Sequence, residues 1–449
     1  MLNKKTNIPS IVAVSLRDRL VHGTKWSIVG AIIAQGLGLL SSIMVAQFIG
    51  KEAFGKFGII LSTVAMFGVF AGMAMGITST KHVAEFRTSD PVRAGRFVGV
   101  PIMLGFWSSL LVSLILVVFA HPIATYIMAE PSLASMIWIS SPLLLFNTLN
   151  GIQTAAIAGL ESFKGLAVIN TAIGVLTFPC IILGVLGWGL AGAIGGLVVS
   201  RIIAYVLLQF YLSKECRCHG ITITYFGLRQ EWRVIWNFSL PTTLAGTIIG
   251  PATWICNVML VNMPGGYGQM GIYNATLQWQ SAIRFVPIRI LDVSLPVLSN
   301  LYGNKDFSRY YRVLRVSLFG ITLMILAVLL PLFLFSQVIM SAFGKDFTSG
   351  FPVLNWMLIG AALHMIARIL SQVAQSRGKA WIDFIFCFVL SVVMLTAWYF
   401  LKHKGAYGLA LATCIGYVVM IFGLCIYALM QYFKDKNLVN KELVHIKAI

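Results

Sequence analysis

Four arginines interrupt long apolar stretches of the sequence: Arg201, Arg284, Arg289 and Arg368. The same stretches hold one clear acid, Asp292. An arginine at the centre of a membrane span costs about 2.5–3.5 kcal/mol on insertion scales, so such residues face a protein interior or a cavity. The planar guanidinium matches phosphate particularly well. These residues therefore predict a cationic cavity that selects an anion carrying phosphate.

The four arginines do not carry equal weight. Arg289 lies three residues before Asp292, and this spacing places both on one helix face, so an internal ion pair explains them as well as a substrate site does. Arg289 and Arg368 also lie in the cytoplasmic half of their segments, where a long side chain can reach the interface. Arg201 and Arg284 are central, and the segment of Arg284 carries the polar Gln278. We expect Arg201 and Arg284 to face a cavity.

Polar side chains recur at helical spacing in two apolar segments. The later segment has them at i, i+4, i+7 and i+11: His364, Arg368, Ser371 and Gln375. The earlier one shows a similar face: Asn147, Gly151, Thr154 and Glu161. A single polar stripe more often marks helix packing than a binding site. Two stripes, one bearing arginine and histidine, favour a shared water-filled cavity.

Composition shows what positions these residues. Of 449 residues, 58% are hydrophobic and only 10% charged, against about 25% charged in soluble domains. The mean hydropathy is +0.87. The chain is therefore an integral membrane protein, and its net charge of +19 indicates membrane orientation before it indicates nucleic acid.

About twelve apolar segments are long enough to cross a membrane, which needs about 20 residues. They lie near 26–48, 54–77, 97–120, 137–159, 166–186, 190–211, 236–261, 270–297, 313–335, 351–375, 382–401 and 406–430. The first is too long for a signal peptide, so we expect it to be retained. With these spans, 24 of the 33 Lys and Arg lie on one side and five on the other. This bias predicts that both termini are cytoplasmic.

Short motifs recur between the two halves at offsets of 213 to 216 residues. Phe54-Gly-Lys-Phe-Gly-Ile59 resembles Tyr267-Gly-Gln-Met-Gly-Ile272, Glu161–Gly165 matches Ser376–Ala380, and Gly189–Gly192 matches Gly405–Gly408. Six spans per half give both halves one orientation, hence a parallel repeat. We expect an N-terminal lobe (1–211), a cytoplasmic linker (212–235), a C-terminal lobe (236–430) and a cytoplasmic tail (431–449). Transporters built this way bind substrate near the midplane between the repeats.

Enzymatic motifs are missing from the sequence. It contains no Walker A, Rossmann or HExxH pattern, and its longest loop has about 23 residues, too short for a catalytic domain. Cys216-Arg217-Cys218-His219 lacks a second ligand pair, so a reduced cytoplasmic loop explains it better than a metal site. We therefore expect a carrier without catalytic residues, metal or cofactor.

Several of these motifs resemble bacterial polysaccharide flippases of the multidrug/oligosaccharidyl-lipid/polysaccharide flippase superfamily. The likeness rests on Trp26–Gly58 with its Ala53-Phe54-Gly-Lys-Phe-Gly58, on Gly159-Leu-Glu-Ser-Phe-Lys164, and on Gly189-Leu-Ala-Gly-Ala193. It implies an all-α, V-shaped bundle of two six-helix lobes around a central cavity in the bacterial inner membrane. It also implies movement of an undecaprenyl-diphosphate-linked oligosaccharide from the cytoplasmic to the periplasmic leaflet for O-antigen or related lipopolysaccharide assembly.

Under this hypothesis Arg201 and Arg284 hold the diphosphate, with Arg368 as a further cation. The sugar lies along the two polar stripes, and the prenyl tail stays in lipid through a gap between the lobes. His364, Asp292 and Glu161 are candidate proton-coupling groups. We expect a monomer without a nucleic-acid partner, with a polysaccharide polymerase and chain-length machinery as candidate protein partners. The alternatives are a drug or metabolite antiporter of the same fold and, from another class, a membrane polysaccharide polymerase.

Overall fold

A computed structural model describes residues 16–72, 75–226 and 248–447. Within these ranges the secondary structure is helical. The N-terminal group comprises α1 (Leu16–Gly72), α2 (Met75–Phe86), α3 (Pro91–Val118), α4 (Ala120–Pro122), a π-helical turn (Ile123–Ile127), α5 (Leu133–Ser140), α6 (Pro142–Gly159) and α7 (Phe163–Cys218). The C-terminal group comprises α10 (Ile249–Val261), α11 (Gly266–Gly303), α12 (Phe307–Leu334), α13 (Ser336–Ser341), α14 (Phe351–Gln375), α15 (Ala380–Leu401) and α16 (Gly405–Lys447).

Glycines with left-handed backbone conformations break the longest helical stretches. At 1.5 Å per residue, the 56 residues of α7 would extend about 84 Å, whereas the hydrocarbon core is about 30 Å thick. Instead α7 breaks at Gly189 (φ 55°), α1 breaks at Gly50 (φ 81°), and Gly405 (φ 58°) separates α15 from α16. Glycine adopts this conformation without a Cβ penalty. The chain therefore turns back where the sequence predicts gaps between spans.

Seven helical stretches among the described residues are long and apolar enough to cross a membrane, and three of them contain one of these breaks. The predicted 351–375 coincides with α14, whereas the predicted 137–159 is divided between α5 and α6. The first part of the predicted 236–261 lies outside the described residues. The prediction of an all-α membrane protein is confirmed. The number of crossings, the repeat and the side of the termini stay predictions.

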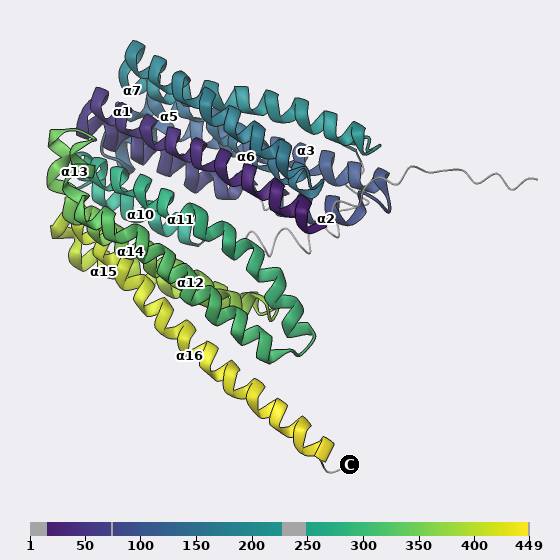
Figure 1. The fold of residues 1–449 in the computed structure, drawn as a ribbon. Helices are drawn as coiled ribbons and strands as arrows, with labels where there is room; N and C mark the ends of the chain where they lie inside the picture. Colours follow the sequence, from purple (N-terminus) through teal and green to yellow (C-terminus); the bar gives the residue numbers. More distant parts are fainter. Residues whose placement is uncertain (1–15, 73–74, 227–247, 448–449) are drawn as a thin grey trace, which may run out of the picture.

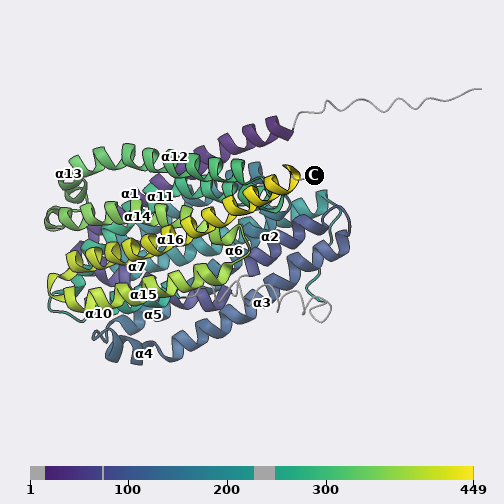
Figure 2. The same cartoon turned by 90° about the horizontal axis from the view of Figure 1, so that it is seen from below.

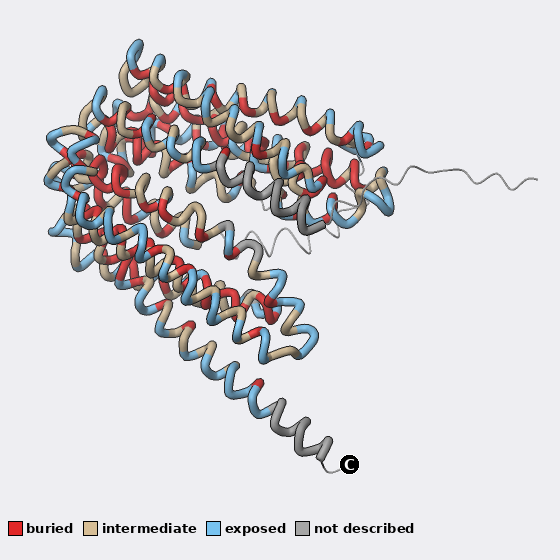
Figure 3. Tube along the Cα trace, viewed as in Figure 1, coloured by how far each residue is buried: buried red, intermediate tan, exposed pale blue. Residues whose placement is uncertain are grey.

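The two helix groups form the arms of a V (Figure 1). Seen from below, the two groups overlap (Figure 2). They meet at one end and separate toward the other, where α16 projects away from α1–α7 (Figure 1). Buried residues lie inside each arm and at the end where the arms meet (Figure 3). One hydrophobic cluster joins both groups, whereas the three others lie within residues 75–223 or 288–425 of a single group.

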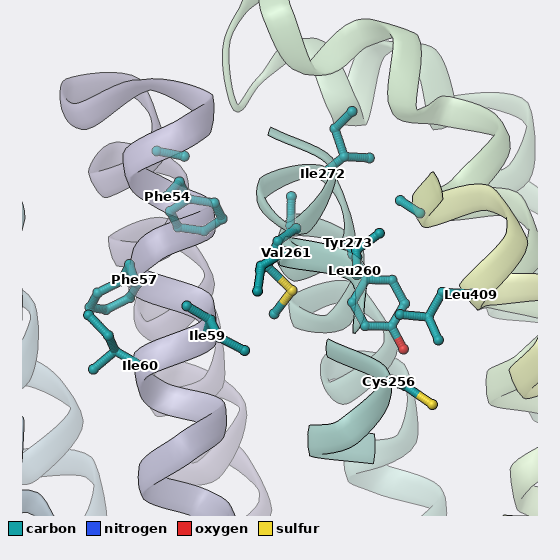
Figure 4. Close-up of a cluster of buried hydrophobic side chains, with 14 of the residues drawn as sticks. Phe54, Phe57, Ile59, Ile60, Cys256, Leu260, Val261, Ile272, Tyr273 and Leu409 are labelled. Carbon is teal, nitrogen blue, oxygen red and sulfur yellow. The ribbon is translucent and has the colours of Figure 1, made fainter. Parts of the chain in front are cut away.

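Aromatic packing fills the junction. Phe54 on α1 is fully buried, and its ring lies 6.2 Å from that of Phe343 and 6.0 Å from that of Phe347, both in the C-terminal group. Ile59 lies one turn further along, on the α1 side of the contact with α10 and α11 (Figure 4). Burial of such side chains in a shared core stabilises the contact between the arms.

The glycine motifs of the two halves meet at the same junction. A Cβ added to Gly55 would lie 1.8 Å from the Tyr267 carbonyl oxygen, and one added to Gly271 would lie 2.2 Å from the Lys51 carbonyl oxygen. Only glycine permits this backbone approach. The motif of the first half thus packs against its counterpart in the second.

Five hydrogen bonds connect the arms near the junction. Each is donated by a side chain of one arm to the other: Trp254 Nε1 to Thr63 Oγ1 (2.9 Å), Asn257 to Ser62 Oγ (2.8 Å), Asn262 to the Ile127 carbonyl (2.7 Å), Tyr267 Oη to the Met128 carbonyl (2.7 Å) and Gln47 to the Ala342 carbonyl (2.7 Å). A typical net contribution is about 1 kcal/mol each. The junction is therefore stable yet built from separable contacts.

Candidate functional site

Arg201 lies on the second half of α7, twelve residues after the break at Gly189. At 1.5 Å per residue this places it about 18 Å along the helix from the break, near the middle of a hydrocarbon core of about 30 Å. The side-chain amide of Asn150 on α6 donates a hydrogen bond to the Arg201 carbonyl (3.0 Å). This bond holds α7 against α6 at the position of Arg201. Within the described residues no acid or carbonyl accepts a hydrogen bond from the Arg201 guanidinium. Its charge is therefore available to a ligand.

Arg201 lies where two cavities of the N-terminal arm meet. The larger, about 700 Å³, has the size of a typical ligand pocket, and apolar side chains and glycines of α1, α2, α6 and α7 form most of its wall. The residues that line it are Leu61, Val64, Ala65, Gly68, Val69, Gly72, Gly76, Ile77, Leu143, Leu144, Asn147, Thr148, Gly151, Ile152, Leu197 and Arg201.

The smaller cavity, about 250 Å³, is more polar. It shares Arg201, Asn147 and Gly151 with the larger one and adds Asn150, Thr154, Asn170, Ile173, Ala204 and Leu208. Asn150 is 9% exposed, and its buried Oδ1 accepts no hydrogen bond from the residues that the structure describes. The polar wall combines asparagine amides and the hydroxyl of Thr154 with Arg201, groups that can hydrogen-bond the hydroxyls of a sugar.

The first predicted stripe is thus partly correct. The structure brings Arg201, Asn147, Gly151 and Thr154 together. It does not include Glu161, because α6 ends at Gly159 and Glu161 follows in a left-handed turn (φ 59°). There Glu161 Oε2 lies 2.6 Å from Arg87 Nη2. The prediction that Glu161 shares the α6 stripe is wrong, and its observed role is an ion pair at the helix end.

A second cationic centre lies in the C-terminal arm, outside both cavities. Arg284 on α11 approaches His364 on α14, with 3.2 Å between Arg284 Nη1 and His364 Nδ1. Arg284 Nε also donates to the Gln280 carbonyl (3.2 Å), and the Tyr417 ring centroid lies 5.2 Å from that of His364. Because a guanidinium only donates hydrogen bonds, this contact requires His364 Nδ1 to be unprotonated. The two predicted site residues therefore contact each other directly.

The second stripe divides along α14. Arg368 is exposed, whereas Ser371 is only 2% exposed and packs inside the arm. Gln375 donates a hydrogen bond to Asp383 on α15 (2.8 Å). The lower part of this stripe thus serves helix packing, which is the simpler of the two interpretations of such a pattern.

For three further predicted residues, Gln278, Arg289 and Asp292, the structure gives few or no side-chain contacts. Gln278 is half-buried on α11. The Arg289 and Asp292 side chains lie outside the described residues, so their ion pair stays a prediction. In the described part of the chain no cluster of three His, Cys, Asp or Glu is placed to hold a metal ion.

Asn150 and Asn170, in the smaller cavity, and Thr148, in the larger one, are polar lining residues that were not predicted. Each asparagine lies in an apolar segment, and Asn150 lies one turn from Asn147. Spacing alone does not separate a cavity-lining asparagine from one bonded inside a helix bundle. The informative signal was the pairing of two asparagines with one helical turn between them.

Comparison with known sequences identifies relatives along most of the chain. Residues 20–302 match the family described as "Polysaccharide biosynthesis protein". The chain is 24% identical to the EPS I polysaccharide export inner membrane protein EpsE of Ralstonia nicotianae, over 87% of this chain and 89% of that protein. It is 24% identical to a putative O-antigen transporter of Shigella flexneri (87% and 92%) and 23% identical to the lipid III flippase of Escherichia coli K12 (90% and 97%).

Solved structures show the same fold. An inward-facing multidrug resistance MATE family transporter of the MOP superfamily superposes with a TM-score of 0.75 at 16% identity, covering 92% of this chain and 99% of the transporter. An outward-facing MATE family transporter gives 0.66, at 16% identity and coverage of 93% and 98%. The lipid II flippase MurJ, in an inward closed conformation, gives 0.71 at 17% identity, over 90% and 87%.

Proposed function

Because the chain belongs to the family of polysaccharide biosynthesis proteins, we propose that it is a flippase for a lipid-linked oligosaccharide. It moves an undecaprenyl-diphosphate-linked repeat unit from the cytoplasmic to the periplasmic leaflet, for O-antigen or related surface polysaccharide. The chain is a multi-pass protein of the bacterial inner membrane, and its relatives include proteins named as an O-antigen transporter and a lipid III flippase.

The observation that carries this proposal is the position of Arg201 at the junction of two unlike cavities, with no hydrogen-bond acceptor for its guanidinium in the described part of the chain. A half-buried guanidinium in a membrane arm, with no acceptor among the described residues, calls for an anionic ligand. The polar pocket beside it, lined by asparagines and Thr154, suits hydroxyl groups. Arg201 therefore binds the diphosphate, and the pocket of Asn147, Thr154 and Asn170 binds the adjoining sugar.

The architecture proposed for this function has twelve crossings in two parallel six-helix lobes, residues 1–211 and 236–430. Residues 212–235 link the lobes, 431–449 form a tail, and both termini are cytoplasmic. The turns at Gly50, Gly189 and Gly405 support this division, because each splits a helical stretch that is too long for one crossing. The mutual packing of Gly55 and Gly271 supports the repeat, because a twofold axis brings equivalent segments together.

In this topology the open end of the V faces the cytoplasm. The higher TM-score with an inward-facing transporter than with an outward-facing one supports this assignment. Alternating access then requires the Phe54 junction to open after the substrate has bound. The inside-negative membrane potential favours outward movement of an anion by about 2.3 kcal/mol per charge per 100 mV.

His364 is the group best placed to couple a proton to this movement. While its Nδ1 accepts from Arg284, a proton on that atom would abolish the hydrogen bond and add a like charge 3.2 Å away. An anion that engages Arg284 would remove both penalties. Substrate binding in the C-terminal lobe and protonation of His364 would therefore favour each other. The measurable sign is a flipping rate that depends on pH in the native protein and not in His364→Gln.

Replacement of Arg201 tests the function. Arg201→Ala should leave the protein inserted, abolish surface polysaccharide and leave lipid-linked repeat units on the cytoplasmic leaflet, whereas Arg201→Lys should retain part of the activity. Arg309→Ala is the matched control, because that side chain is 75% exposed and distant in sequence from the cavities. Normal export by Arg201→Ala would refute the proposed site. Unchanged polysaccharide with increased dye sensitivity in a deletion strain would instead support a drug antiporter.

A further inference from the structure

The larger cavity has a mostly apolar wall, and no side chain of the described residues fills its volume. Glycines of two helices line part of it: Gly68 and Gly72 on α1, and Gly151 on α6. A Cβ added to Gly72 or Gly151 would meet nothing within 4 Å, and one added to Gly68 would meet only Leu144 Cδ2 at 3.8 Å. These glycines therefore leave open a volume that ordinary apolar residues would have filled.

The apolar cavity and the polar pocket adjoin each other at the charged side chain of Arg201. Arg201, Asn147 and Gly151 belong to both, so the guanidinium separates a wall of Leu, Val, Ile and Gly from a wall of asparagines and Thr154. A lipid-linked sugar has the same order of chemistry: isoprenoid, diphosphate, sugar. An apolar ligand with a negative group at one end is the class that fits both the lining and the charge.

We propose that the larger cavity binds the isoprenoid units next to the diphosphate of the substrate. The first part of the prenyl chain then lies inside the N-terminal arm along Gly68 and Gly151, and only the remainder of the chain extends into lipid. This inference rests on the proposed function, and it replaces the expectation that the whole tail stays in the membrane.

Hydration of the apolar wall makes the empty cavity unfavourable, so an isoprenoid that displaces this water is bound favourably. In the proposed inward-facing state the V admits cytoplasmic water, so an empty apolar wall is hydrated. A free phospholipid chain gains little by leaving other lipid chains, which are equally apolar. An isoprenoid tethered to a diphosphate on Arg201 is held beside the cavity, so it occupies the cavity at a high effective concentration.

Glycine-to-leucine substitutions test the cavity without disturbing packing. Gly68→Leu and Gly151→Leu would place a side chain in the volume assigned to the isoprenoid. Gly36→Leu is the matched control, because Gly36 lies on the exposed surface of α1, outside both cavities, and a Cβ there also meets nothing within 4 Å.

Binding is measured by calorimetry on the full chain in phosphatidylcholine nanodiscs, with empty nanodiscs as the partition blank. The probes are farnesyl diphosphate and inorganic diphosphate. Each buried CH₂ changes affinity about fourfold, so displacement of two or more by Leu should weaken farnesyl diphosphate binding about tenfold or more. Gly68→Leu should bind inorganic diphosphate like the native protein, and Gly36→Leu should bind both probes normally.

The outcomes separate the two proposals. If Gly68→Leu and Gly151→Leu keep native affinity for farnesyl diphosphate, the isoprenoid assignment is refuted. If the native protein binds both probes equally, the assignment is also refuted, because phospholipid then fills the cavity. In either case, loss of binding of both probes in Arg201→Ala would leave the proposed function standing. Unaltered binding in Arg201→Ala would refute the proposed function itself.

Discussion

The closed end of the V should open when a single methyl group is added at Gly55. A Cβ at this position would lie 1.8 Å from the Tyr267 carbonyl oxygen, 2.8 Å from its carbon and 2.9 Å from the Gly271 nitrogen. All three are backbone atoms, so no side-chain rotation relieves the clash. Ordinary contact begins near 3.4 Å, so α1 and α11 must separate by about 1.6 Å at this point.

The cost of Gly55→Ala follows from that separation. Overpacking of a tight contact costs about 1–3 kcal/mol. A shift of this size also breaks short hydrogen bonds across the junction, such as Tyr267 Oη to the Met128 carbonyl at 2.7 Å, each worth about 1 kcal/mol. We therefore expect the closed state to lose at least about 2 kcal/mol, which shifts the equilibrium toward the open junction about 30-fold.

A cysteine at Ile59 reports the opening. Ile59 is fully buried at the junction, so in a chain whose seven native cysteines are replaced, Ile59→Cys should label slowly with a membrane-impermeant maleimide in intact cells. Adding Gly55→Ala should raise the labelling rate strongly. Gly268→Ala is the matched control, because this glycine occupies the equivalent motif position but its Cβ would meet only the flexible end of Lys51, at 3.1 Å.

Gly271→Ala should behave like Gly55→Ala, since its Cβ would lie 2.2 Å from the Lys51 carbonyl oxygen. Equal labelling of Gly55→Ala and Gly268→Ala, with both proteins inserted at normal levels, would refute the reasoning. It would mean that the arms tolerate the added methyl group without separating at the Phe54 junction.

Three further changes have definite outcomes. Arg377→Gln breaks a buried ion pair: Arg377 Nη2 lies 2.6 Å from Asp435 Oδ2, and the two side chains are only 1% and 4% exposed. Thermal unfolding in detergent should show a loss of about 3–5 kcal/mol in the free energy of unfolding. The control Arg309→Gln, at an exposed side chain, should change this free energy by less than about 1 kcal/mol. Tyr267→Phe removes one hydrogen bond to the Met128 carbonyl and should raise Ile59→Cys labelling about fivefold, for a loss of about 1 kcal/mol. The hydroxyl of Ser132, and then Lys56, lower the pKa of Glu130. The Lys56–Glu130 pair should therefore persist at neutral pH and be lost as the pH falls through that lowered pKa, and Glu130→Gln should remove its contribution to the pH dependence of thermal unfolding in detergent.

Much of the fold was predictable because the membrane constrains it strongly. Apolar segments of about 20 residues must be helices, since no water satisfies their backbone groups. The α14 boundaries were clear for this reason, with Pro352 at its start and Ser376-Arg-Gly-Lys at its end. The predicted segment 137–159 ends where α6 ends, at Gly159, but the polar stripe was continued past that end to Glu161, where the chain turns.

The site was predictable in residue type and less so in geometry. Arg201, Asn147 and Thr154 followed from polarity and helical spacing, which depend on one or two segments. Arg377 was counted as a loop charge, yet it is buried against Asp435 and lies over the Tyr302 ring (4.7 Å). Its partners are 58 and 75 residues away, so no local pattern revealed the contact.

The two arms share a scaffold but differ in their chemistry. With the offset of 216 between Gly189 and Gly405, the position equivalent to Arg201 is Tyr417. In the C-terminal arm Tyr417 lies against His364, and the cation comes instead from Arg284 on a different helix, already hydrogen-bonded to His364. One arm thus presents Arg201 beside open volume, without an acceptor in the ranges that the structure describes, and the other presents Arg284, whose release requires His364 to change partner. A substrate anion held first by Arg201 and then shared with Arg284 would stabilise the approach of the two arms at the open end of the V, which is the step that must precede opening of the Phe54 junction.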